Sequence, residues 1–572
     1  MTYSMFARST SCALAASVVM AMAAPSLAQT QSPSQVPPGQ TLEQRAPTGS
    51  FSFPAAQGLT APDGAEAIRL ILRDLRVDGG LTPLDARTQA LKPAVGSEVS
   101  VADIYGYAAA LQAAYFIAGY PLVRVVVPAQ DIEREAGIVR IQVVSGFVER
   151  IDVDSLPGAV RGRVEAVLRS LVNREPLTAS EFERRLLLAG ETSGLALQSA
   201  LSPGLRTGGT VLVLAGEYRP IQMALAFDDS LSDDIGREQV TGSLALNSLL
   251  GLGERIILTA ALSPNDISWS NSTLRRYASL YAEAPVGRNG LRLGSEVVYS
   301  ATAPQGASAP LRLQNVFNRA SIFVSAATLR SRFRWQNVKL SFDASTEEQT
   351  TGILGFPVPL FTDRTRVARF GIDGSEPIIL YGRMGYELEL SQGFNGLGAR
   401  SIDDATPLRP LSRFGADAEF TRLQGALNVV MPLGGAFSAQ MALRGQASFG
   451  DPLLRSEQGN IASSELISGP PAGLLVGDDT FAGRIEMRRS ITAGRATLLP
   501  YAFSAAGRTW LKTPLEGERP RTDTGAIGAG VRFDAAQDGR TSMSGRLEWS
   551  HVESDQTFAG GDWLSASLTL RY

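Results

Sequence analysis

Cysteine and histidine are nearly absent from this 572-residue sequence, which contains only Cys12 and His551. One cysteine cannot form an intramolecular disulfide, and neither residue type is numerous enough for a thiolate or histidine metal site. A Ser-His-Asp triad would have to use His551, which lies in the strand-like segment 548–553, so we interpret it as an ordinary strand or rim residue. No GxSxG or phosphate-loop motif occurs. We therefore expect no cofactor, no metal and no enzymatic activity, an outer-membrane phospholipase being the enzymatic alternative.

Long apolar runs and an excess of positive charge are missing as well. No stretch of about 18 uninterrupted apolar residues occurs after the N-terminus, so a membrane-spanning helix is not expected. Lys and Arg number 53 against 56 Asp and Glu, and this balance does not indicate a nucleic-acid partner. If the chain resides in a membrane, it must therefore cross it as a closed β-barrel.

The N-terminus has the features of an export signal. Arg8 precedes an apolar run over 12–24, and Ser26-Leu27-Ala28 is a small-x-small cleavage site. This pattern predicts a secretory signal peptide at residues 1–28, whose removal would also remove Cys12. Residues 29–62 are rich in Ser, Gln, Pro and Gly, which predicts a linker. Within it only 41–45 favours a helix, so a short plug segment is the alternative reading of this region.

Two segments after the linker share one pattern. Residues 63–146 are interpreted as a strand, a helical region with a helix over 101–120, and two strands over 122–127 and 138–144. Residues 147–218 repeat this order, with a predicted capping box formed by Thr178 and Glu181 at the start of a helix. The sequence thus predicts two small α+β modules in tandem, related by pattern and not by sequence identity.

Residues 219–572 are predicted to contain strands only. Short turns such as 287–290 and 434–435 alternate with long polar stretches, which is the asymmetry of an outer-membrane barrel. The longest polar stretches are at 303–313, 345–363, 396–412, 453–479 and 512–522. The region has 572 − 218 = 354 residues, or about 22 per strand for sixteen strands. The last ten residues alternate strictly and end on an aromatic residue, which predicts a final barrel strand; Leu568, Leu570 and Tyr572 lie on its apolar face.

This order of segments resembles the TpsB family, the transporter half of two-partner secretion (hemolysin secretion/activation proteins of the ShlB/FhaC/HecB type). The segments 116–123 and 144–151 carry the local resemblance, the second at the junction between modules. The resemblance implies a mainly β fold, with two periplasmic α+β POTRA modules followed by a C-terminal 16-stranded transmembrane β-barrel. It also implies residence in the outer membrane of a Gram-negative bacterium. The aromatic end is similar to the signal that the barrel-assembly machinery recognises.

Two motifs of that family are altered in this sequence. A pore loop of the family carries Val-Arg-Gly-Tyr, and the matching position here reads Ile467, Ser468, Gly469 and Pro470. A partner strand of the family reads Phe-x-Asp-x-Gly, and here Phe503, Ala505 and Gly507 occupy the fixed positions. Both members of an Arg–Asp pair are therefore absent together, which leaves no buried charge without a partner. We expect other contacts to hold the loop, with candidates Arg508, Arg484, Glu486 and Arg488. The alternative is that these four are ordinary lumen-facing residues.

The resemblance further implies a pore that secretes a large unfolded exoprotein of the TpsA type. An exposed sheet edge can bind an extended chain by strand addition, because main-chain hydrogen bonds supply affinity without strict sequence reading. The candidate edge is the strand over 122–127 beside the predicted helix, with Leu122, Arg124, Val126, Tyr107 and Leu111. The alternative for the apolar ones is that they form the module core. An assembly factor that inserts other barrels is the alternative function. The expected partners are the exoprotein, the barrel-assembly machinery and the lipid bilayer.

Overall fold

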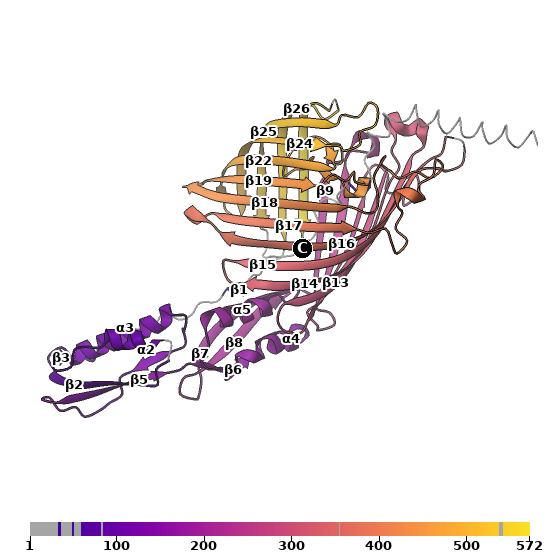
Figure 1. The fold of residues 1–572 in the computed structure, drawn as a ribbon. Helices are drawn as coiled ribbons and strands as arrows, with labels where there is room; N and C mark the ends of the chain where they lie inside the picture. Colours follow the sequence, from indigo (N-terminus) through magenta and orange to yellow (C-terminus); the bar gives the residue numbers. More distant parts are fainter. Residues whose placement is uncertain are drawn as a thin grey trace, which may run out of the picture.

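The computed structural model describes residues 33–35, 49–50, 59–81, 84–353, 355–536, 541–556 and 558–572. The predicted signal peptide and the predicted plug segment at 41–45 lie outside these residues. Figure 1 shows three bodies in a row, with two small modules leading to a large barrel. Among the described residues, no helix is long and apolar enough to cross a membrane.

The first module is a four-stranded sheet covered by two helices. Its sheet order is β3-β2-β5-β4, with β2 and β5 parallel and the other two pairs antiparallel. The predicted helix is confirmed, and its Ser100 N-cap forms a full capping box with Asp103. Its core lies between the helices and the sheet. The elements are β2 (Arg69–Asp78), α2 (Asp85–Leu91), β3 (Glu98–Ser100), α3 (Val101–Ile117), β4 (Arg124–Val126) and β5 (Gly137–Val144).

The second module repeats this topology, with β6 and β8 parallel and β7 and β8 antiparallel. The predicted capping box is only half formed. Thr178 accepts a hydrogen bond from the Glu181 amide, but the Glu181 carboxylate pairs with Arg174 at 2.9 Å. A strand from the linker, β1 (Gly49–Ser50), pairs in parallel with β7. The other elements are β6 (Phe147–Asp152), α4 (Gly158–Leu168), η2 (Arg169–Leu171), α5 (Ala179–Gly190), β7 (Leu195–Pro203) and β8 (Gly209–Tyr218).

The rest of the chain forms a closed antiparallel barrel of sixteen strands, as predicted. β22 and β23 both pair with β24 and count as one wall strand. The barrel closes where β27 pairs with β9. The wall strands are β9 (Ile221–Asp228), β10 (Gln239–Asn247), β11 (Arg255–Leu262), β12 (Arg275–Val286), β13 (Leu291–Thr302), β14 (Gln314–Arg330), β15 (Trp335–Thr351), β16 (Val358–Pro377), β17 (Arg383–Gly393), β18 (Thr421–Gly434), β19 (Phe437–Ala447), β22 (Asp479–Arg489), β23 (Ile491–Ala493), β24 (Ala496–Trp510), β25 (Arg521–Ala536), β26 (Ser542–Ser554) and β27 (Gly561–Arg571).

One predicted loop is wrong. The polar stretch 345–363 belongs mostly to β15 and β16, and only about its middle connects the two strands. The error has a physical cause. Lumen-facing side chains of a large barrel are polar, so the sequence of a strand rich in them resembles that of a loop. Side chains of β15 such as Glu347 and Gln349 point inward and are buried at 1% exposure each. The remaining short elements lie in connections: η3 (Asp233–Ile235), η4 (Gly306–Leu311), η5 (Ile379–Tyr381), η6 (Ile402–Asp404), η7 (Arg455–Glu457), β20 (Gly459–Asn460) and β21 (Val476–Gly477).

The second module is joined to the near rim of the barrel by packing and by charge. Ala327 of β14 is part of the hydrophobic core of that module, beside Leu188 of α5. Arg184 donates to the Ala327 carbonyl at 2.9 Å, and Glu191 pairs with Arg330. The fold of the second module is therefore completed by the barrel.

Candidate functional site

A long segment between β19 and β22 folds back into the barrel; we call residues 448–478 the lumen loop. Several of its apolar side chains, among them Leu453, Ile461 and Ile467, are fully buried. Ile461, Leu466 and Ile467 pack in one cluster with Phe503 and Ala505 of β24. The loop thus lies against the inner wall formed by the last strands, and it contains the predicted motif position 467–470.

Ser468 ties the tip of the lumen loop to the wall. Its Oγ accepts a hydrogen bond from Arg484 Nη1 at 2.8 Å, and its carbonyl accepts one from Ser550 Oγ at 3.0 Å. Ser468 and Arg484 are both only 2% exposed. At Ser468 the loop therefore supplies a hydroxyl acceptor, and the arginine that binds it comes from the wall.

Arg484 is held by carboxylates and an aromatic ring of the wall. Its Nη2 lies 2.6 Å from Glu548 Oε2 and its Nε lies 2.7 Å from Glu486 Oε1. The guanidinium carbon stacks 3.5 Å from the ring centroid of Phe503. Arg484 is the cross-strand partner of Ala505. Because the Ala505 side chain is small, the guanidinium can stack on the ring of the neighbouring Phe503. A buried arginine with this many partners is a fixed donor.

Glu486 extends the network on the same strand. It receives two hydrogen bonds of 2.8 Å from Arg532 of β25 and one of 2.7 Å from Arg488 Nε. Tyr501 adds a hydrogen bond of 2.5 Å to Glu548 Oε2. Among the predicted contacts, Arg484 therefore touches the loop directly, while Glu486 and Arg488 support it from the wall.

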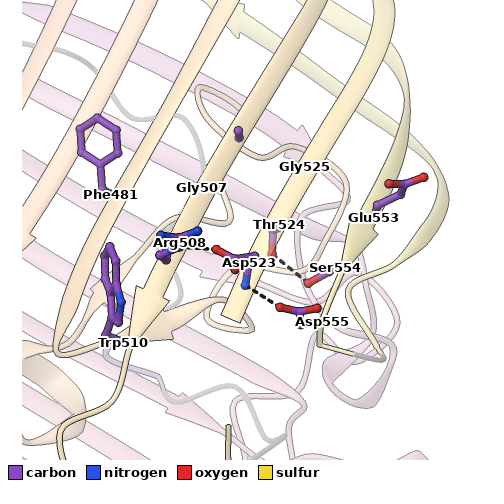
Figure 2. Close-up of a pocket in the computed structure, with 11 residues that line it drawn as sticks. Phe481, Gly507, Arg508, Trp510, Asp523, Thr524, Gly525, Glu553, Ser554 and Asp555 are labelled. Carbon is purple, nitrogen blue, oxygen red and sulfur yellow. Dashed lines mark hydrogen bonds and ion pairs between the residues drawn. The ribbon is translucent and has the colours of Figure 1, made fainter. Parts of the chain in front are cut away.

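Arg508 does not take part in this network. Alternation along β24 turns it to the outer face of the barrel, where it pairs with Asp523 beside Trp510, as Figure 2 shows. These residues line a pocket with Phe481 and Glu553. The expectation that Arg508 holds the pore loop is wrong, because an odd–even shift of one residue places a side chain on the opposite face of a strand.

A second anchor, missed by the sequence reasoning, fixes the start of the lumen loop. Glu457 lies between two arginines of the wall, with Arg369 Nη2 at 2.8 Å and Arg422 Nη1 at 2.9 Å. Burial alone would raise the pKa of Glu457, but the guanidinium groups of Arg369 and Arg422 hold that pKa below its ordinary value. No local sequence pattern marks Glu457, because its partners come from strands far away in the chain.

A third anchor closes the other end of the loop. Asp478 is fully buried and accepts hydrogen bonds from the Leu453 amide at 3.0 Å and the Lys512 amide at 2.7 Å. It also accepts one from the Gln458 side chain at 3.2 Å. A carboxylate that receives backbone donors from both sides holds two loop segments together.

A short N-terminal segment also lies in the lumen. Ser300 of β13 donates to the Pro33 carbonyl at 2.8 Å, and Ser34 donates to Glu347 at 2.9 Å. The Gln35 side chain donates to the Arg455 carbonyl of the lumen loop at 2.6 Å. The N-terminal stretch is thus bound to the wall and to the loop. No group of three His, Cys, Asp or Glu side chains in the described part of the chain is placed to hold a metal.

The predicted client-binding edge on the first module is only partly exposed. Arg124 and Val126 lie on the edge strand β4 and are exposed. Leu122, Tyr107 and Leu111 are buried at 5%, 6% and 1% exposure, Leu122 in the core of the second module and the others in that of the first. The prediction that these three residues form an exposed binding edge is wrong. Their side chains fill the cores of the two modules, as the alternative interpretation stated.

The apolar face of the last strand points outward. Leu568 and Leu570 are exposed on β27, and the Tyr572 amide and carbonyl each bond to Met223 of β9 at 2.9 Å. The terminal residues therefore form part of the seam that closes the barrel.

Family comparisons agree with this architecture. The model described as "Haemolysin secretion/activation protein ShlB/FhaC/HecB" matches residues 208–533, and the one described as "POTRA domain, ShlB-type" matches residues 70–146. This chain belongs to the ShlB/FhaC/HecB family. It is an outer-membrane β-barrel protein whose POTRA modules lie in the periplasm.

Individual relatives are distant. The heme/hemopexin transporter protein HuxB of Haemophilus influenzae (strain 86-028NP) is 25% identical over 198 residues, which is 34% of each chain. The match thus spans about a third of the length of that curated relative. CdiB from Escherichia coli has the same fold, with a TM-score of 0.67 at 15% identity over 98% of both chains. CdiB from Acinetobacter baumannii has a TM-score of 0.57 at 14% identity, covering 88% of this chain and 90% of that one.

Proposed function

We propose that this protein is the outer-membrane pore of a two-partner secretion system. It receives an unfolded TpsA-type exoprotein at its POTRA modules and passes it through the barrel to the cell surface. Family membership and the fold support this assignment. The observation that carries it is the content of the lumen, where the loop is held by Ser468, Glu457 and Asp478 through polar contacts with the wall. When the loop leaves the channel, these polar contacts would be exchanged for water, and the apolar cluster of Ile461, Leu466 and Ile467 would be exposed.

The proposal assigns a role to each part of the chain. Residues 1–28 are the signal peptide, 29–62 the linker, 63–146 and 147–218 the two POTRA domains, and 219–572 the barrel. Ser468 with Arg484 keeps the pore loop at rest and replaces the Arg–Asp pair of the family. Leu568, Leu570 and Tyr572 form the signal for the barrel-assembly machinery, and the outer surface contacts the lipid bilayer. The protein acts as a conduit and not as an enzyme.

The family resemblance implies that a large exported protein is encoded next to the gene for this chain, and surface delivery of that candidate tests the function. Whole cells with and without this protein are treated with protease, and cleavage of the exported protein reports its exposure. We expect exposure only in cells that contain this protein. Normal exposure in its absence, together with a loss of other barrel proteins from the outer membrane, would favour an assembly factor instead.

A further inference from the structure

A pocket on the outer face of the barrel takes no part in holding the lumen loop. It lies where β22, β24 and β25 run side by side, and Figure 2 shows Phe481 and Trp510 on one side of it and Glu553 on the other. Ala506 and Gly525, which are cross-strand partners, line it between these larger side chains. A Cβ built on Gly525 would have nothing within 4 Å. The two small residues therefore leave a hollow of about 700 Å³ in the outer wall.

The pocket lies at the extracellular end of the barrel. The periplasmic second module packs against the rim that carries the short turn between β12 and β13, where Arg184 donates to the Asn289 carbonyl at 3.2 Å. Because successive wall strands are antiparallel, β24 begins at this rim and ends at the opposite one, where residues 511–520 connect it to β25. Trp510 is the last residue of β24. The pocket is thus at the level where aromatic residues mark the outer boundary of the hydrocarbon layer.

The surroundings of the pocket face lipid. Phe481, Ile485 and Ile527 point outward on β22 and β25, and each is more than half exposed. An outward band of exposed apolar side chains is the part of a barrel that contacts the bilayer. The pocket opens sideways at the edge of this band, so a soluble partner cannot reach it. A membrane lipid is therefore the occupant that the position favours.

Two guanidinium groups are held at the pocket by one carboxylate. Asp523 accepts hydrogen bonds from Arg508 Nε and from Arg521 Nε, the second at 2.8 Å. The Arg508 guanidinium also lies over the Trp510 ring, 5.6 Å from its centroid. Within the described part of the chain, no group accepts a hydrogen bond from Arg508 Nη1 or Nη2. This edge of Arg508 is therefore available for the two-point contact that a guanidinium makes with a phosphate group.

A carboxylate lies on the other side of the pocket. Glu553 of β26 is exposed at its margin, and no described residue donates a hydrogen bond to its side chain. An ionised carboxylate only accepts hydrogen bonds, so it suits a hydroxyl group of a ligand. The ion pairs of Arg508 and Arg521 with Asp523 are exposed and add little to stability. The pocket thus combines donors for an anion with an acceptor for hydroxyl groups, next to an apolar wall.

We propose that this pocket binds the headgroup of a phosphorylated glycolipid, the lipid class that Gram-negative outer membranes carry in their outer leaflet. A phosphate group lies against Arg508 and Arg521, a sugar hydroxyl donates to Glu553, and the acyl chains run down the wall past Ala506 and Ile527. Small-ligand sites have volumes of about 300–1,000 Å³, so the hollow takes a headgroup and leaves the acyl chains outside. The inference depends on residence in the outer membrane and not on the proposed pore function.

Native mass spectrometry of the purified full-length protein in detergent tests the pocket. The probe is lipid A, an acylated diglucosamine bisphosphate, and the variant Gly525→Phe fills the hollow with a side chain. The matched control is Gly242→Phe, because Gly242 lies on the outer face of β10 and a Cβ there would also have nothing within 4 Å. We expect the unmodified protein and Gly242→Phe to retain a single glycolipid, and Gly525→Phe to lose it. Equal retention by all three proteins would overturn the proposal.

A second variant tests the phosphate contact without filling the pocket. Arg508→Met removes both Nη donors, and we expect affinity for lipid A to fall about tenfold or more, since hydrogen bonds to charged groups contribute about 1.5–3 kcal/mol each. Lipid A without its phosphate groups should bind the unmodified protein as weakly as intact lipid A binds Arg508→Met. Heat-dependent gel mobility shows that each variant barrel is folded. Undiminished binding by folded Arg508→Met would contradict the assigned phosphate contact.

Competition identifies the occupant. Phosphatidylglycerol supplies a phosphate and hydroxyl groups without sugar rings, and inorganic phosphate supplies the anion alone. We expect neither to displace lipid A at equal concentration. Displacement by phosphatidylglycerol would mean a general contact with anionic lipids, and displacement by inorganic phosphate a simple anion site; either would overturn the glycolipid assignment. A dimer present in the unmodified protein and absent from Gly525→Phe would assign the pocket to a second copy of this chain. Failure of the secretion test leaves all of these outcomes unchanged, so the two proposals are tested separately.

Discussion

Arg484 of β22 donates a 2.8 Å hydrogen bond to Ser468 Oγ of the lumen loop, so the charged partner of this loop contact belongs to the wall. The motif expected from the family resemblance would place the arginine on the loop and the acid on the wall. Here the wall supplies both the arginine and its acids, Glu486 and Glu548. The charge therefore stays paired when the loop leaves, which lowers the cost of releasing the loop.

Replacing Arg484 should release the loop tip. Arg484→Met keeps an unbranched apolar side chain but removes the donor to Ser468 and leaves Glu548 without its guanidinium partner. Breaking a buried pair from one side costs about 3–5 kcal/mol. We expect higher conductance in planar bilayers and faster proteolysis within residues 448–478. Arg508→Met is the matched control, since its exposed pair contributes about 0–1 kcal/mol. Similar behaviour of the two variants would contradict the assigned anchor.

Restoring the family pair should reveal coupling between two positions. Ser468→Arg alone places a second guanidinium beside Arg484 in a buried site, so we expect it to expel the loop. Ala505→Asp alone adds a carboxylate across the strands from Arg484 and should be milder. The double variant should recover much of the loss, with a coupling of about 0.5–3 kcal/mol. Thermal unfolding of the four proteins, followed by gel mobility, measures this cycle; additive losses would argue against contact between the two positions.

Acid should loosen the start of the lumen loop through Glu457. Its pKa in the folded protein lies below the ordinary glutamate value of 4.5, because Arg369 and Arg422 outweigh the effect of burial. A depressed pKa contributes stability that is present above that ordinary value and is lost as the pH falls through the folded value. We expect channel conductance to be constant near neutral pH and to rise below pH 4.5. Glu457→Gln should be more conductive at neutral pH and insensitive to this acid range. An unchanged acid response in that variant would assign the titration to another group.

The sequence was sufficient for the architecture because the relevant signals are local. Strand alternation, turn spacing and the terminal aromatic residue each depend on neighbours along the chain, and together they predicted a large barrel; the number of sixteen strands came from the resemblance to the TpsB family. The helix over Val101–Ile117 was predictable for the same reason, from the apolar spacing within the segment.

The contacts of the site were not predictable in the same way. Glu457 is recognised as an anchor only when Arg369 and Arg422, on β16 and β18, are brought to one point of the lumen. The choice between Arg484 and Arg508 depended on which face of each strand looks inward, which alternation leaves open until the register is known. The cover on β7 comes from two linker residues whose composition suggested no strand at all.

Gly469 is the position where the smallest change should displace the loop. Its φ is +111°, and a Cβ there would lie 2.7 Å from Ser550 Oγ and 2.8 Å from Trp563 Cβ. Gly450, in the same loop, has a φ of +110° but nothing within 4 Å. Both alanine variants have an unfavourable backbone, at about 1–3 kcal/mol, but only Gly469→Ala also collides with the wall. Because Ser550 holds the Ser468 carbonyl, the collision should break the contact next to the Arg484 anchor. We expect Gly469→Ala to raise conductance and proteolysis of the loop, and Gly450→Ala to leave both near the unmodified level. Equal effects of the two would mean that backbone strain alone, and not contact with β26 and β27, determines where the loop tip lies.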